Sequence, residues 1–133
     1  MKGNLIKFNY DRSKVKPGIF HFSVGNFHRA HLAFYTNFLL EEPGNENWGI
    51  CGAMFFPFDE ARYKGMKQQN GMYTLTVCGR DGVDKAYCIG SIVDVLWAVE
   101  DPKAVINKIA DKDNKIITMT ITEGGYFTDN KTG

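Results

Sequence analysis

Residues 19–31 read IFHFSVGNFHRAH and run from an apolar strand through a turn of small residues into the start of a helix. Gly25 lets backbone amides approach a ligand without a Cβ in the way, and Ser23 and Ala30 are also small. The amino-terminal end of a helix carries positive potential, so a phosphate group fits such a turn. The stretch therefore predicts a fold that binds a dinucleotide through its pyrophosphate.

Basic residues sharpen this interpretation. His28, Arg29 and His31 fall in the predicted first turn of the helix, where positive charge opposes the helix dipole. A bound anion would relieve the conflict. A strand, a glycine turn and a helix are nevertheless common to most α/β proteins, so the turn alone is weak evidence.

The rest of the chain predicts an α/β domain with a mainly parallel sheet, flanking helices and an inserted β-hairpin. Apolar runs predict strands at 18–24, 48–55 and 115–122, and alternation around Arg80-Asp81-Gly82 predicts a hairpin of strands 72–78 and 85–92. Helices are expected at 29–41 and 59–69, and after the Asp101-Pro102 pair, which supplies an N-cap and a proline at the first helical position. Residues 1–17 are polar and are expected to form an arm on the surface.

Five segments carry a resemblance to a known family. They are GNFHRAH at 25–31, WGICG at 48–52, GMYTL at 71–75, IGSIVD at 89–94 and TITEGGY at 120–126. In this order they resemble the long-chain polyol dehydrogenases, the group that contains mannitol 2-dehydrogenase, fructuronate reductase and tagaturonate reductase.

The resemblance implies that residues 1–133 are an amino-terminal, Rossmann-like NAD(P)-binding domain and that the carboxy-terminal substrate domain is absent. Such enzymes transfer hydride, without a metal, between a secondary alcohol of a polyol or sugar acid and nicotinamide. Their lysine base and the asparagines that assist it lie in the carboxy-terminal region. We therefore assign no catalytic residue within this chain and expect it alone to be inactive. NAD is the expected cofactor, with NADP not excluded.

The predicted pyrophosphate site consists of Ser23, Gly25, Asn26, Phe27 and His28, acting mainly through backbone amides, together with Arg29. Ser23 departs from the family, which usually has glycine there. If that position needs a positive φ, serine costs on the order of 1 kcal/mol. If φ is negative, its hydroxyl is free to bind a phosphate or a water molecule.

Several of these residues have a second interpretation. Arg29 would either contact phosphate or be solvated or paired with an acid elsewhere. Phe27 suits packing better than chemistry, and His31 suits packing or a domain contact.

Asp59 is the first acid after the second predicted strand, and it is the candidate for the adenosine ribose. A carboxylate accepts hydrogen bonds from a ribose diol and repels a 2′-phosphate, so Asp59 would favour NAD. Its alternative role is a helix N-cap. Arg62 would help to hold a 2′-phosphate if Asp59 pointed away.

The resemblance places Thr122, Glu123 and Gly124 near the nicotinamide and the entrance for the substrate. Glu123 would either tune protonation there or hold backbone amides. We do not assign it as the catalytic base.

Composition narrows the remaining choices. A net charge of +1, from 16 basic and 15 acidic residues, does not indicate a positively charged surface that would bind nucleic acid or an anionic membrane. No long apolar segment and no secretory signal is evident. The three cysteines, Cys51, Cys78 and Cys88, are expected to be reduced and mostly buried, in a cytoplasmic protein. His28 and His31 lack the third ligand that a zinc site needs, so no metal is assigned.

The sequence also allows two other functions to be considered. A stand-alone, non-catalytic nucleotide- or anion-binding module is the main alternative, and the balanced charge disfavours an RNA-binding domain. Partners are expected to be a polyol or sugar-acid substrate, bound through the absent domain, and further copies of the chain that cover exposed apolar surface.

Overall fold

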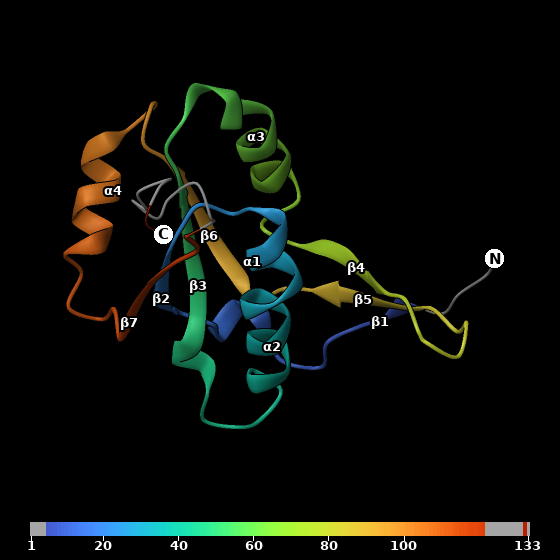
Figure 1. Ribbon diagram of the computed structural model, residues 1–133. Coiled ribbons are helices and arrows are strands. Elements are labelled where there is room, and N and C mark those ends of the chain that lie inside the picture. The colour runs from blue at the N-terminus through green and yellow to red at the C-terminus, as the bar shows by residue number, and fades with distance from the viewer. Residues whose placement is uncertain (1–4, 122–131, 133) are drawn as a thin grey trace.

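A four-stranded parallel sheet forms the centre of the computed structural model, which describes residues 5–121 and 132 (Figure 1). Its order is β6-β3-β2-β7, and every neighbouring pair is parallel. The strands are β2 (Pro17–Phe22), β3 (Gly49–Met54), β6 (Ile92–Trp97) and β7 (Ile116–Met119). All six residues of β3 are buried, as expected for a central parallel strand covered on both faces.

Helices cover both faces of this sheet. They are α1 (Asn26–Ala30), α2 (Leu32–Leu39), α3 (Glu60–Gln68) and α4 (Pro102–Ile109). Ala33 of α2 and Met66 of α3 pack with Ile50 on one face, whereas Val105 of α4 packs with Phe20 on the other. The molecule is therefore a three-layer α/β/α domain, which confirms the predicted fold class. No helix among the described residues is long and apolar enough to cross a membrane.

The first helix differs from its prediction. Helical structure was expected over 29–41, but it begins at Asn26 and is interrupted at His31, where φ is −121° and ψ is −86°. The imidazole Nδ1 of His31 lies 2.9 Å from the carbonyl oxygen of Phe27, four residues earlier. The backbone amide of His31 also donates to that carbonyl at 3.0 Å, so the break lies in the dihedral angles of His31 and not in a lost hydrogen bond.

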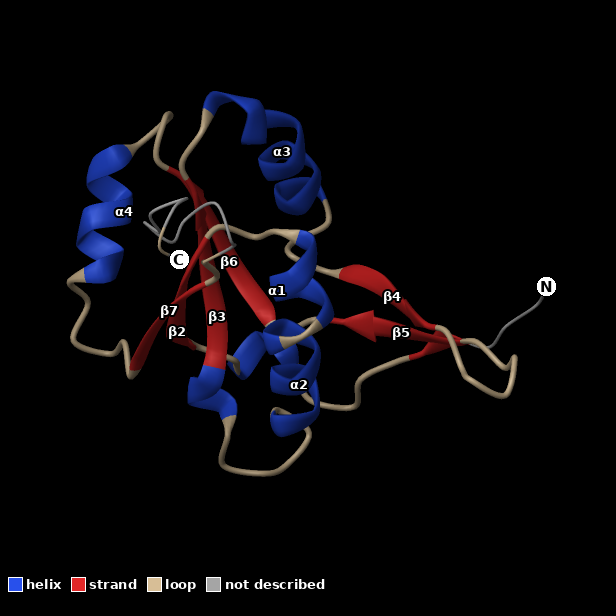
Figure 2. Ribbon diagram, in the orientation of Figure 1, coloured by secondary structure: helices blue, strands red, loops and turns tan. Residues whose placement is uncertain are grey.

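A smaller sheet extends from one side of the domain (Figure 2). It has the order β1-β5-β4 and consists of β1 (Leu5–Ile6), β4 (Tyr73–Val77) and β5 (Lys85–Ile89). The antiparallel pairing of β4 with β5 confirms the predicted hairpin. The amino-terminal segment is more than a surface arm, because Leu5 and Ile6 pair with β5 as a parallel strand.

Strand β6 was not predicted separately from the hairpin. The expected strand 85–92 ends at Ile89, and the chain passes Gly90 before it enters the main sheet at Ile92. A Cβ at Gly90 would lie 2.5 Å from the Phe8 ring, so the chain can turn there only without a side chain. Asp94 in the middle of β6 also hides the apolar pattern of a buried strand.

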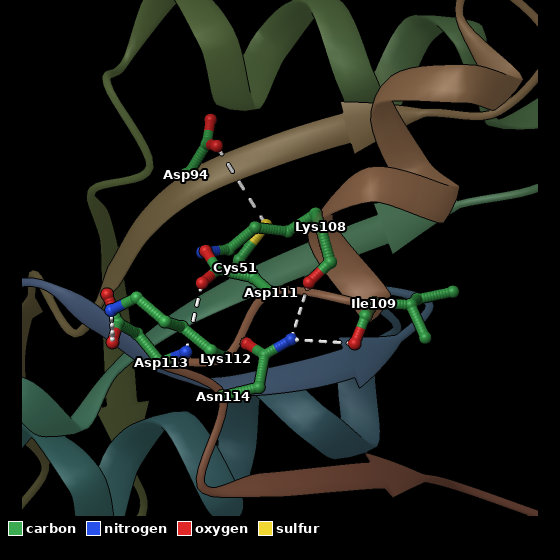
Figure 3. A network of polar contacts seen from close by, with 8 residues as sticks. All are labelled: Cys51, Asp94, Lys108, Ile109, Asp111, Lys112, Asp113 and Asn114. Atoms are coloured by element: carbon green, nitrogen blue, oxygen red, sulfur yellow. Dashed lines mark hydrogen bonds and ion pairs between the residues drawn. The ribbon is translucent and has the colours of Figure 1, made fainter.

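The carboxy-terminal end of α4 is held by polar contacts that set the entry into β7 (Figure 3). Asn114 donates from its amide to the carbonyls of Lys108 and Ile109, and the Lys108 ammonium lies 2.8 Å from the Asp111 carboxylate. At the other end of α4, the Asp101 side chain accepts from the amide of Ala104 at 2.9 Å, which confirms the predicted N-cap.

The cysteines are free thiols, but they are not all buried. Cys51 is buried on β3, Cys88 is half-buried, and Cys78 is exposed, so the expectation of burial was wrong for Cys78. Burial raises the pKa of the Cys51 thiol to about 12, and the neighbouring Asp94 carboxylate acts in the same direction.

Asn37 joins three parts of the fold. Its buried side-chain oxygen on α2 accepts hydrogen bonds from the Tyr10 hydroxyl at 2.7 Å and from the Gly90 amide at 2.8 Å. The contact connects the amino-terminal segment, α2 and the passage between the two sheets.

We predict that Asn37→Leu lowers the free energy of unfolding by about 2 kcal/mol, because the buried Gly90 amide loses its acceptor. Asn107→Leu is the matched control, since Asn107 is also helical but exposed. Urea unfolding followed by circular dichroism measures both. Equal effects of the two substitutions would show that Asn37 does not hold these parts together.

Candidate functional site

The sheet order locates the candidate site. From β2 the chain moves outward to β3 and β6, and then returns to place β7 on the other side of β2. In open α/β sheets, ligands bind beyond the carboxyl ends of the strands where the direction of winding reverses. In this chain that point lies between the ends of β2 and β7.

A pocket of about 290 Å³ lies at this reversal point. Residues from the end of β2, the following turn, the start of α1 and the segment after β7 line it: His21, Ser23, Gly25, Asn26, Phe27, His28 and Thr120. The structure thus brings five of the predicted pyrophosphate residues together around one opening.

Ser23 adopts the left-handed conformation, with a φ of 76°. Of the two alternatives for this position, the structure therefore has the one that costs serine on the order of 1 kcal/mol. The Ser23 amide donates to the carbonyl of Ala53 on β3 at 2.6 Å, which holds the turn against the neighbouring strand.

Gly25 precedes α1 and has ordinary extended dihedral angles, with φ −75° and ψ 176°. A Cβ built on it would meet nothing within 4 Å. Neither backbone conformation nor packing within the described residues requires glycine here. The open space that faces the pocket is consistent with a glycine that leaves room for a ligand.

Arg29 is held beside the turn without a carboxylate partner among the residues that the structure describes. Its guanidinium donates to the Asn26 side chain at 2.5 Å and lies 5.7 Å from the centre of the Tyr73 ring. The Tyr73 hydroxyl also donates to the Arg29 carbonyl at 2.6 Å. The ion-pair alternative is not observed, and the charge of Arg29 stays close to the turn. Phe27 is 60% exposed and stacks on His31 with ring centres 4.1 Å apart.

His28 stands where the third glycine of the G-x-G-x-x-G fingerprint allows close packing of helix on strand. Instead of a close backbone contact, its ring stacks on that of His21 in β2, with centres 3.7 Å apart and planes 14° apart. Both side chains are only 2% exposed. The Nδ1 atom of His21 lies 2.7 Å from the hydroxyl oxygen of Thr118 on β7.

Both imidazoles are neutral at pH 7. Burial lowers the pKa of His21 to about 4. Burial, with smaller contributions from His21 and Arg29, lowers the pKa of His28 to about 3. His31 lies at the end of α1 rather than in its first turn. The expected cluster of three cations at the helix start is therefore wrong, and only Arg29 supplies charge there.

Asp59 has structural partners. Its carboxylate is 2% exposed, accepts from the Phe56 amide at 3.3 Å and lies 2.8 Å from the Arg62 guanidinium. Asp59 occupies the N-cap position of α3, but its side chain accepts no hydrogen bond from a backbone amide of that helix. Its carboxylate therefore stabilises the short turn before α3 and binds Arg62, and the alternative of a hydrogen-bonding N-cap is not observed.

The remaining predicted site residues, Thr122, Glu123 and Gly124, lie outside the described part of the chain. Three residues at the pocket were not predicted from the sequence. His21 and Thr120 line the pocket, and Thr118 contacts His21. The sequence contained evidence that His21 faces the helices. Alternate residues of a strand share a face, so His21 lies on the same face as Ile19, which packs with Ala33 of α2.

Larger openings exist elsewhere. One of about 440 Å³ is lined by lysines and aspartates such as Lys112 and Asp113, but it lies at the amino ends of the strands. One of about 510 Å³ is mainly apolar and lies between α2 and β7. Position at the reversal point, rather than size, selects the smaller pocket. Among the described residues, no three histidine, cysteine or acidic side chains gather as metal ligands would.

Comparison with known proteins bears on this site. Residues 17–132 match the family model described as the mannitol dehydrogenase Rossmann domain. Mannitol 2-dehydrogenase from Phaeosphaeria nodorum is 43% identical over 123 residues, which are 92% of this chain and 22% of that protein. The enzyme of the same name from Aspergillus fumigatus is 42% identical over 132 residues, covering 98% of this chain and 26% of that protein.

Solved structures show the same relation. Substrate-free D-sorbitol dehydrogenase matches with a TM-score of 0.87 and 38% identity, over 98% of this chain and 27% of that one. The ternary complex of Pseudomonas fluorescens mannitol 2-dehydrogenase with NAD and D-mannitol matches with a TM-score of 0.88 and 35% identity, over 97% of this chain and 26% of that one. The chain spans about a quarter of the length of these relatives.

The buried histidine pair predicts instability in acid. An unfolded histidine takes up a proton below pH 6.5, whereas the folded pKa values of about 4 and 3 keep both rings neutral. The unfolded state therefore binds more protons, and stability falls as the pH drops from 7.5 to 5, by about 2 kcal/mol for each ring. Urea unfolding at the two pH values measures the loss.

His28→Phe keeps a flat ring but cannot titrate, so its acid loss should be about 2 kcal/mol smaller than that of the wild type. His31→Phe, at an exposed histidine, is the control and should retain the full loss. If His28→Phe lost as much stability as the wild type between pH 7.5 and pH 5, the pair would not govern stability in acid.

Proposed function

Because the chain belongs to the mannitol dehydrogenase family through its Rossmann domain, we propose that it is the dinucleotide-binding part of a metal-independent, NAD-dependent polyol oxidoreductase. The observation that carries the proposal is the pocket at the reversal point between β2 and β7, with open space above Gly25. A solved relative with NAD and D-mannitol bound supports the cofactor and the substrate class.

The residues of the turn fit a pyrophosphate. Backbone amides in the first turn of a helix have no partner within it, and those of Asn26 and Phe27 border the pocket. Gly25 leaves the approach open, and Arg29 supplies a positive charge not neutralised by any described carboxylate. When bound, NAD supplies the nicotinamide ring that exchanges hydride with a carbinol carbon of the substrate.

We retain Asp59 as the residue that binds the adenosine ribose. It follows β3, the strand next to β2, and so lies on the side where an adenosine would extend from the turn. A carboxylate has about four lone-pair positions. The Phe56 amide and Arg62 occupy two of them. Because Asp59 is 2% exposed, a ribose hydroxyl would reach the others only when the partly exposed Arg62 side chain moves aside.

The chain's own part in the reaction is to bind and orient the cofactor. Two of its lysines are engaged with acids: Lys64 lies 2.6 Å from Glu60, and Lys67 lies 3.4 Å from Asp94. We propose that the proton-accepting base belongs to the substrate domain of the whole protein, and that Thr122, Glu123 and Gly124 border the nicotinamide.

The proposed substrate class is polyols, with mannitol as the named substrate of relatives and sugar acids as the wider family alternative. Residues 1–133 would form most of the nucleotide domain. Three free cysteines fit a reducing, cytoplasmic environment. Exposed apolar residues on α2 and β7, such as Tyr35 and Ile117, favour self-association of this chain when nothing else covers them.

Gly25→Val tests the pyrophosphate turn. Gly25→Val should abolish binding of NADH without unfolding the domain, because a Cβ at this position meets no described atom within 4 Å, and the larger side chain fills the approach to the pocket. Titration of NADH, followed by energy transfer from Trp48 or Trp97, measures affinity, and a thermal melt checks the fold. Gly65→Val is the control, since Gly65 also has open space but lies on α3. Unchanged NADH affinity in Gly25→Val would remove the turn from the site.

Asp59→Ser tests the proposed contact with the adenosine ribose. Asp59→Ser should shift preference from NADH toward NADPH by roughly 1–2 kcal/mol, the range of a charge-assisted hydrogen bond. The substitution removes the carboxylate and releases Arg62 toward a 2′-phosphate. Glu60→Ser, which breaks an exposed ion pair on the next residue, should leave the preference unchanged. If Asp59→Ser lowered the affinities for NADH and NADPH equally, Asp59 would have only a structural role.

A further inference from the structure

Three imidazole nitrogens beside the candidate pocket are buried and have no hydrogen-bond partner among the residues that the structure describes. They are Nε2 of His21 and both ring nitrogens of His28. Both residues line the pocket and are 2% exposed. An unpartnered buried polar group destabilises a protein by about 1–3 kcal/mol, so a site that keeps such groups calls for an explanation.

A metal ion does not explain them. The two rings are stacked with planes 14° apart and centres 3.7 Å apart, so their nitrogen lone pairs run side by side and cannot converge on one ion. No third ligand from a described residue joins them.

The contacts around His21 and His28 differ. The Thr118 hydroxyl oxygen lies 2.7 Å from Nδ1 of His21 and 3.4 Å from the carbonyl oxygen of Phe20, so it holds the His21 ring in either tautomer. A neutral imidazole carries one N–H. Neither nitrogen of His28 has a partner among the described residues, so the N–H of His28 is free to donate.

We propose that the side chain of His28 is a binding residue that donates a hydrogen bond to a pyrophosphate oxygen of the dinucleotide, while His21 and Thr118 fix its ring. This inference rests on the proposed function and adds a side-chain donor to the backbone amides of the turn. His28 lines the pocket together with Gly25 and Asn26. A phosphate oxygen accepts from an imidazole N–H, whereas an adenosine moiety without phosphate offers no anionic acceptor there.

Stacking on His21 holds the His28 ring in a fixed position. The ring of His28 is pressed against β2 at the position where a glycine would bring helix and strand together. Thr118 lies on β7 and His21 on β2, in register with each other. The donor is thus anchored to both strands that border the reversal point.

The test uses ADP-ribose, which contains the pyrophosphate but lacks nicotinamide, and adenosine, which contains neither phosphate nor nicotinamide. His28→Phe keeps the stacked ring and removes the N–H, and it should bind ADP-ribose about tenfold more weakly than the wild type, with adenosine binding unchanged. Tyr35→Phe, which alters an exposed side chain on α2 that does not line the pocket, should bind both ligands as the wild type does. Calorimetry measures the affinities.

A second measurement needs no variant. In the wild-type chain with labelled histidine, ADP-ribose should shift the side-chain ¹⁵N resonances of His28, and adenosine should not. Equal ADP-ribose affinity in His28→Phe, or no His28 shift on saturation, would overturn the proposal and leave the proposed function standing. Absence of any binding of ADP-ribose and NADH to the wild type would overturn the proposed function and this inference with it.

Discussion

The stacked imidazoles of His21 and His28 join the central strand of the sheet to the first helix, and the shape of the candidate site depends on this contact. With ring centres 3.7 Å apart, the pair sets how far α1 stands from β2. A glycine in place of His28 would let the helix approach more closely, as in the usual dinucleotide fingerprint. Both rings are neutral when stacked and buried, because burial lowers their pKa values. The stability of the site therefore depends on pH.

Other contacts hold the turn from two sides. The Ser23 amide is bound to Ala53 on β3, and the Tyr73 hydroxyl on the smaller sheet is bound to the Arg29 carbonyl. Gly52 on β3 has no space for a side chain, because a Cβ there would lie 2.3 Å from Val24. The strained serine and the buried histidines are therefore tolerated within a frame that both sheets support. Strain held by rigid surroundings is typical of ligand-binding turns.

Much of this architecture follows from local sequence patterns. Apolar runs predicted the parallel strands β2, β3 and β7, Asp101-Pro102 predicted the start of α4, and alternation around Gly82 predicted the hairpin, all of which the structure contains. What failed depends on long-range contacts. The break at His31 has no glycine or proline to indicate it in the sequence, and β6 was hidden by Asp94. The pairing of Leu5 with β5 joins residues about 80 positions apart. The site shows the same division. Gly25 was evident from the turn, whereas the partners of His28 and Asp59 emerge only when strands and helices meet.

A map of amide chemical shifts during titration with NADH tests the central claim most directly. If the dinucleotide binds at the reversal point between β2 and β7, the largest changes fall on Gly25, Asn26, Phe27 and Thr120, which border the pocket there. Changes confined to Lys16, Lys112 and Lys115, around the larger opening at the amino ends of the strands, would contradict the assignment of the site.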